Sequence, residues 1–137
     1  MLNGVIAQKL QTLDEILLEL RSLDEVNAAS LSDDWRTRRA VERDLQILVE
    51  IVIDVCQRLI SLAGQSPAAT GADALARCVQ MGALSDDDAY RQMVRFRNFI
   101  VHRYERIDVE ILAAVIDRQL PDFDRFREEI LAYVAQH

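Results

Sequence analysis

Apolar residues recur at every third or fourth position along almost the whole chain, the spacing that places them on one face of an α-helix. The first helical segment, for example, has apolar side chains at positions 5, 6, 10, 13, 16, 17 and 20. Only four glycines and two prolines interrupt the 137 residues, and no alternating strand pattern continues for more than a few of them. We therefore predict an all-α fold, an antiparallel bundle of four to five helices that forms one domain over residues 1–137.

Turn and capping residues divide this pattern into five expected helices. Ser32 or Asp33 is placed to cap the second helix and Ser85 the fourth, because their side-chain oxygens can accept free N–H groups of a first turn. Pro121 should kink or interrupt the last helix, since proline has no N–H donor. The expected helices cover about residues 2–23, 34–62, 71–81, 85–102 and 108–135, with residues 30–34 as a connector.

Composition disfavours several classes of protein. The N-terminal segment is amphipathic and acidic, unlike a secretory signal peptide, and no apolar run reaches the length of a membrane span. Cys56 and Cys78 lack the spacing of a zinc or redox motif, so we expect reduced, buried thiols. No histidines, cysteines and carboxylates have metal-ligand spacing. We expect a soluble, cytoplasmic protein that uses no membrane, metal or cofactor.

The charge of the chain is unevenly distributed. The formal net charge is −7, which argues against a general nucleic-acid coat protein, and we expect no DNA partner. Residues 91–106 nevertheless contain five arginines and one acid, so this stretch carries a charge of about +4. An acidic body with one basic stretch indicates a local anion-binding site rather than a nonspecific grip on a polymer.

The second expected helix carries a narrow polar stripe. Between positions 45 and 56 its only polar residues are Gln46, Glu50 and Asp54, which are four positions apart and so nearly aligned along the helix. The rest of this segment is apolar, which is typical of a helix buried on most sides. The stripe either faces solvent or faces a polar cleft or dimer seam, where it pairs with arginine.

Residues 97–104 bring together groups that suit chemistry on a phosphodiester. Arg97 and Asn98 precede His102, and Tyr104 follows it. A guanidinium can hold a phosphate in a fork, and an imidazole titrates near neutral pH and can transfer a proton. Tyr104 is either a surface residue that covers the core or a phenol near His102 that binds a base, orients a phosphate or accepts a modification.

Projected at 100° per residue, the fourth expected helix has two opposite faces. The apolar face holds Ala89, Met93, Phe96 and Ile100, and the cationic polar face holds Arg91, Arg95, Asn98 and His102. Arg97 lies about 40° from Met93, where its guanidinium either reaches solvent or pairs with Glu50 or Asp54. Arg97 and His102 are about 140° apart on a regular helix. Acting on one phosphate therefore requires a loosened helix end or motifs from two chains.

The motif formed by Arg97, Asn98, His102 and Tyr104 resembles that of HepT-type ribonuclease toxins in the HEPN superfamily. Their hallmark is Arg-x-x-x-x-His-x-Tyr with Asn after the Arg. The lead-in at 93–96, the segment 107–111, the polar stripe and the Leu120–Pro121 step are also similar, so the resemblance covers most of the chain. One departure is Arg103, where relatives often carry an acid.

The resemblance implies a metal-independent endoribonuclease that works as a homodimer, with the motifs of both chains lining one cleft. It also implies a type VII-like toxin–antitoxin pair, in which a minimal nucleotidyltransferase antitoxin transfers AMP from ATP to Tyr104. Adenylation would add bulk and negative charge to the basic stretch and so compete with RNA. The toxin itself needs no cofactor, since ATP is used by the partner.

The leading hypothesis is cleavage of single-stranded RNA by attack of a ribose 2′-OH on its adjacent phosphate. His102 acts as general base or acid, Arg97 stabilises the transition state and Asn98 positions it. The backbone of the RNA is drawn in by Arg91, Arg95, Arg103 and Arg106. The alternative is a non-catalytic helical adaptor that binds a nucleotidyltransferase or another protein. The RNA target, the oligomeric state beyond a dimer and the number of adenylates on Tyr104 stay open.

Overall fold

The computed structural model describes residues 3–102 and 108–137, with the backbone alone for residues 100–102. These described residues form seven α-helices and no strand, which confirms the all-α prediction. The helices are α1 (Gly4–Arg21), α2 (Ala28–Asp33), α3 (Trp35–Leu62), α4 (Gly71–Gln80), α5 (Asp88–His102), α6 (Val109–Arg118) and α7 (Leu120–Gln136).

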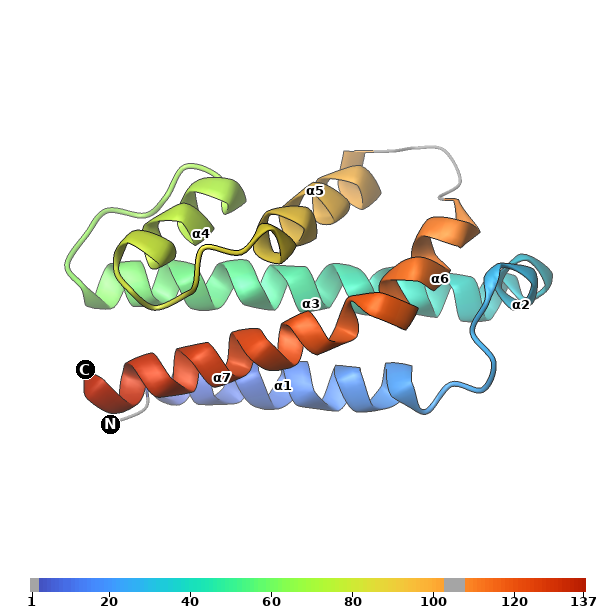
Figure 1. Cartoon of the computed structure of the whole chain (residues 1–137), viewed down its shortest axis with the longest axis horizontal. Helices are drawn as coiled ribbons and strands as arrows, with labels where there is room; N and C mark the ends of the chain where they lie inside the picture. The colour runs from blue at the N-terminus through green and yellow to red at the C-terminus, as the bar shows by residue number, and fades with distance from the viewer. Residues whose placement is uncertain (1–2, 103–107) are drawn as a thin grey trace.

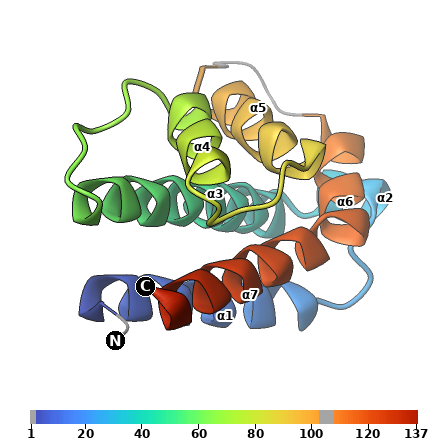
Figure 2. The same cartoon turned by 60° about the vertical axis from the view of Figure 1, so that its left-hand side comes forward.

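Helix α3 is the centre of the bundle. It runs along the length of the molecule, with α1 and α7 on one side and α4 and α5 on the other (Figure 1). The same order is seen after rotation (Figure 2). Its inner side is fully buried, as at Val41, Leu45, Val52 and Ile60, none of which exposes any surface. The flanking Ile47 and Ile53 are half-buried, which explains why the apolar part of this helix is wider than a single stripe.

The expected connector at 30–34 is largely helical, and the predicted caps there are wrong. Asn27 caps α2: its side chain accepts the Ser30 N–H, while the Ser30 hydroxyl accepts the Asn27 N–H. Asp34, not Ser32 or Asp33, caps α3, because it has extended backbone and its carboxylate accepts two N–H groups of the first turn. The reciprocal cap at Asn27 thus makes a short helix of what the sequence suggests is a loop.

The last expected helix is interrupted rather than kinked. Helix α6 ends at Arg118, and α7 begins at Leu120 with Pro121 in its first turn. Proline is suited to that position because the first N–H groups of a helix have no partner within the helix. This break, together with α2, raises the number of helices from the five expected to the seven described.

The segment before α5 is tied to α7 by Glu129. Its carboxylate accepts hydrogen bonds from the backbone N–H of Ser85 at 3.2 Å, from the Ser85 hydroxyl and from the Tyr90 hydroxyl at 2.6 Å. Ser85 is therefore not the N-cap that the sequence predicts. Asp87 accepts the Ala89 N–H at 2.8 Å and so supplies the capping interaction instead. The Ser85 hydroxyl therefore bonds to another helix, α7, and does not cap α5.

Two further expectations concern burial. Cys56 and Cys78 are both fully buried and unpaired by a disulfide, with the Cys78 thiol 3.7 Å from the Cys56 carbonyl oxygen. The prediction of buried thiols is confirmed. Within residues 3–102 and 108–137, no helix is both long and apolar enough to span a bilayer.

Candidate active site on helix α5

Helix α5 has the two faces that its sequence predicts. Met93 on the inner face is 2% exposed and Phe96 is half-buried, whereas Arg91, Arg95 and Asn98 are exposed. Packing of the inner face against α3 fixes the rotation of α5 and so directs the polar face outward. The backbone stays helical as far as His102.

Arg91 is less available for a ligand than the sequence suggests. Its Nη1 lies 2.7 Å from Asp86 and its Nε lies 3.0 Å from Asp88. Hydrogen bonding to these two carboxylates raises the pKa of Arg91, and hydrogen bonds from Arg91 and Gln92 lower the pKa of Asp88. The charge at the beginning of α5 is thus largely balanced within the chain.

Arg95 is the more open cation on this face. Its side chain is 69% exposed, and its Nη2 lies 3.9 Å from Asp88. An ion pair that long and that exposed contributes little to stability. The guanidinium of Arg95 is therefore free to turn toward an incoming anion.

Arg97 lies on the inner side, as the helical projection predicts, and has no carboxylate partner within the described part of the chain. Its Nε is buried without a hydrogen bond, and its Nη1 is 3.5 Å from the Asn98 amide oxygen. The pairing with Glu50 or Asp54 offered by the sequence is wrong. A half-buried guanidinium with an unsatisfied donor is costly to keep unless a ligand completes it.

The polar side chains of the α3 stripe bond to one another and to α1. Gln46 donates a hydrogen bond to Glu50 at 3.0 Å, and both side chains are half-buried. Asp54 is exposed and pairs with Lys9 of α1 at 3.2 Å. The stripe therefore interacts along α3 and with α1, and none of its side chains bonds to a described side chain of α5.

Several predicted site residues lie outside the described residues. These are Arg103, Tyr104 and Arg106, and for His102 the structure describes the backbone alone. The described part of the motif is Arg97 and Asn98, together with the surface beside them. Within residues 3–102 and 108–137 no group of three or more potential metal ligands occurs.

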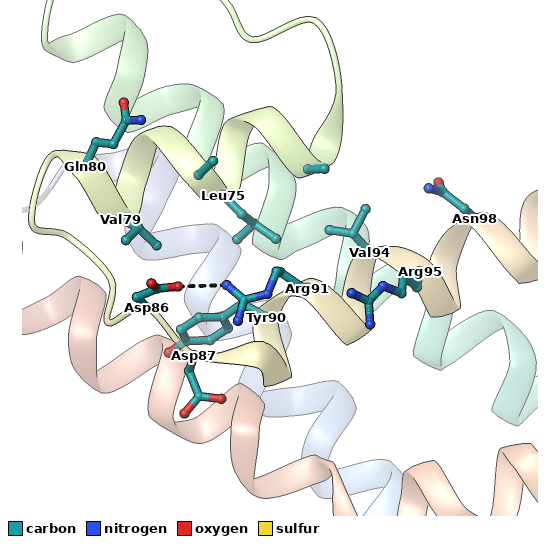
Figure 3. Close-up of a pocket in the computed structure, with 12 residues that line it drawn as sticks. Leu75, Val79, Gln80, Asp86, Asp87, Tyr90, Arg91, Val94, Arg95 and Asn98 are labelled. Atoms are coloured by element: carbon teal, nitrogen blue, oxygen red, sulfur yellow. Dashed lines mark hydrogen bonds and ion pairs between the residues drawn. The ribbon is translucent and has the colours of Figure 1, made fainter.

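A cavity of about 530 Å³ lies between α4 and α5, and sequence analysis did not predict it. Arg91, Arg95 and Asn98 line it from α5 (Figure 3). The opposite wall comes from α4, including Leu75, Val79 and Gln80. Only the packing of α4 beside α5 creates this space, since the two walls are separated in the sequence by the loop 81–87.

Comparison with known proteins assigns the family. The model of the family described as Ribonuclease HepT-like matches residues 8–130. The chain belongs to the HepT-like ribonuclease family. Its matched range includes all of α3 and α5, so the family assignment covers the motif and the helices that support it.

Individual relatives of the HepT-like family agree with this assignment. The mRNA nuclease HepT of Shewanella oneidensis is 22% identical over 133 residues, covering 96% of this chain and 99% of that protein. The fold matches a tri-AMPylated HEPN toxin of the same organism in complex with its MNT antitoxin, with a TM-score of 0.85 and 22% identity over 96% of this chain and 99% of that one. A toxin–antitoxin structure with AMP-PNP matches at a TM-score of 0.83, with 21% identity over 96% of this chain and 99% of that one.

Proposed function

We propose that this HepT-like protein is a metal-independent endoribonuclease toxin that cleaves single-stranded RNA. Arg97 is the observation that carries the proposal: a half-buried guanidinium with an unsatisfied Nε, beside Asn98, on the helix of the motif. A guanidinium that no carboxylate of the described residues engages can bind a phosphate. The relative named mRNA nuclease HepT supports RNA as the substrate.

The residues divide the reaction between them. A ribose 2′-OH attacks the adjacent phosphorus, and the bond to the 5′ oxygen of the next nucleotide breaks. His102 takes the proton from the 2′-OH or supplies one to the leaving oxygen. Arg97 and Asn98 stabilise the charge that develops on the phosphate oxygens. Arg95 attracts the RNA backbone with Arg103 and Arg106, while Arg91 contributes less because acids already engage it.

A homodimer is part of the proposal. Helix α5 is regular to His102, and residues five positions apart on a regular helix point about 140° from one another. Arg97 and His102 of one chain therefore do not face the same phosphate readily. Two copies of the motif, one from each protomer, would place an arginine of one chain opposite a histidine of the other.

The proposed off-switch is adenylation of Tyr104 by a minimal nucleotidyltransferase antitoxin, which uses ATP. The tri-AMPylated toxin in complex with an MNT antitoxin supports such a partner. Co-expression with the neighbouring nucleotidyltransferase in the cytoplasm should add one or more adenylate masses to the protein. Tyr104→Phe should remove this increment, whereas Tyr133→Phe, a change in α7, should retain it.

The central test is cleavage of single-stranded RNA by purified protein in EDTA. We expect wild type to cut and His102→Ala to lose activity by about 10²–10⁴-fold. His137→Ala is the matched control, because His137 is the other of the two histidines and lies at the C-terminus. Circular dichroism should show the same helicity in all three proteins. Cleavage that stops in EDTA, or that persists in His102→Ala, would contradict the proposal, and absence of cleavage by wild type would favour the adaptor.

A further inference from the structure

The cavity between α4 and α5 has the size of a small-ligand site. Its volume of about 530 Å³ lies within the range of roughly 300–1,000 Å³ that such sites occupy. Asn98 lines the cavity and directly follows Arg97 in the motif. The cavity thus begins at the proposed site and extends along α5 toward its first turn (Figure 3).

The walls of the cavity are apolar where a flat ring would lie. Leu75 and Val79 of α4 face Val94 and Tyr90 of α5 across it. Tyr90 is buried, its hydroxyl donates to Glu129 at 2.6 Å and the Arg125 guanidinium lies over its ring, so it lines the cavity without a free polar group. The apolar side chains of Leu75, Val79 and Val94 suit the faces of a nucleobase.

The two ends of the cavity differ in charge. Gln80 and Asp86 lie at one end, and Arg95 and Asn98 lie at the other (Figure 3). Asp86 pairs with Arg91 at 2.7 Å, so this end offers no free cation to a phosphate, while the Asp86 carboxylate can still accept hydrogen bonds from the edge of a base. Arg95 is exposed and held by only a long contact with Asp88, so it can receive a phosphate. A nucleotide therefore fits in one orientation, with its phosphate toward the motif.

We propose that this cavity binds one nucleotide of the RNA substrate, next to the phosphate that is cleaved. The base lies between α4 and α5, and its phosphate contacts Arg95 and Asn98. This subsite rests on the proposed ribonuclease function and adds to it a means of holding the strand beside the motif. It also explains how an acidic protein can bind RNA through a short basic stretch, since burial of a base against apolar side chains adds affinity to that of charge.

Ala76 offers a way to fill the cavity without disturbing the core. It is exposed, lies in the middle of α4 and lines the cavity, so Ala76→Trp would occupy the space of the base. Ala135→Trp is the matched control, because Ala135 is also an exposed helical alanine but lies near the end of α7, away from this cavity. Both variants are made without the antitoxin, so that the protein is unmodified.

The experiment measures fluorescence anisotropy with a labelled single-stranded RNA that carries 2′-O-methyl groups and so cannot react. We expect Ala76→Trp to bind about tenfold more weakly than wild type, because one base loses its apolar site, and Ala135→Trp to bind like wild type. Binding by Ala76→Trp within twofold of wild type would overturn the subsite. So would a change in its oligomeric state by size-exclusion chromatography, because the cavity would then belong to a protein interface.

The same proteins separate this inference from the proposed function. Cleavage of the unmodified RNA is measured in parallel. If wild type binds but does not cut, and Ala76→Trp alone loses binding, the nuclease proposal fails and the nucleotide site stands. If wild type cuts and Ala76→Trp both binds and cuts equally well, the nuclease proposal stands and the subsite is wrong.

Discussion

The two ends of α5 make a sharp contrast within one helix. At its beginning, Arg91 bonds to two aspartates, and Asp87 pairs with Arg125 of α7 at 3.0 Å. Toward its end, Arg95 has one long contact and Arg97 has a buried, unsatisfied Nε. The arginines are chemically identical, and only the carboxylates around them differ. One end of the helix is therefore anchored to the bundle, while the other keeps its cations available.

The largest expected effect is on RNA cleavage and comes from changing Arg97, toward the C-terminal end of α5. Arg97→Ala should lower the rate of RNA cleavage by about 10²–10³-fold, because charge stabilisation in the transition state is lost. The free energy of unfolding should change by less than about 1 kcal/mol, since Nε makes no hydrogen bond that could be lost. Single-turnover cleavage and urea denaturation measure the two quantities. A large loss of stability with unchanged cleavage would show that Arg97 stabilises the fold and does not take part in cleavage.

The next largest effect is on stability and comes from changing Glu129, which holds the N-terminal end of α5. Glu129→Ala should lower the free energy of unfolding by about 2 kcal/mol, because the Tyr90 hydroxyl, on a side chain that is 2% exposed, loses its partner. Glu128→Ala is the neighbouring control: Glu128 is exposed and pairs with the adjacent Arg127, so its loss should cost less than about 0.5 kcal/mol. Equal destabilisation by both changes, measured in urea, would show that the Glu129 contacts do not anchor α5.

A smaller effect compares the two arginines directly. Arg95→Gln should weaken RNA binding and reduce the slope of log affinity against log salt by about 1, as expected for one lost phosphate contact. Arg91→Gln should change the slope less, because Asp86 and Asp88 already balance its charge. Anisotropy titrations from low to high salt give both slopes. Identical slopes in the two variants would show that Arg91 and Arg95 are equally available to phosphate.

The smallest expected effect is a change in the pH dependence of Tm, which comes from Asp87. The Ala89 N–H and Arg125 lower the pKa of Asp87, so its ionised form stabilises the folded state. That stabilisation is present above the usual pKa of about 4 and is lost as the pH falls through the lower folded value. Asp87→Asn should therefore have a lower Tm than wild type at pH 6, and the difference should shrink as the pH falls below the usual pKa of the carboxyl. A constant difference in Tm across this range would show that the carboxylate charge of Asp87 does not matter.

Much of the fold follows from local patterns that act within one segment. Periodicity predicts α1, α3, α4 and α5 within a few residues, because each has one strong apolar stripe. It misses α2, whose cap at Asn27 depends on a reciprocal bond with Ser30, and it assigns Ser85 to a cap although Glu129 holds it. Both errors concern short polar side chains, which bond equally well to a helix end or to a distant partner.

The amino-acid sequence alone determined the helical class, the two faces of α5 and the motif that includes Arg97 and Asn98, because all of these depend on spacing along the chain. Tertiary structure decided which charges are engaged and which are open. It placed Asp54 beside Lys9 instead of Arg97, and it brought α4 against α5 to form a cavity that neither helix has alone. The ion pair and the cavity each form between helices that are separated in the sequence, so only the packing of those helices specifies them.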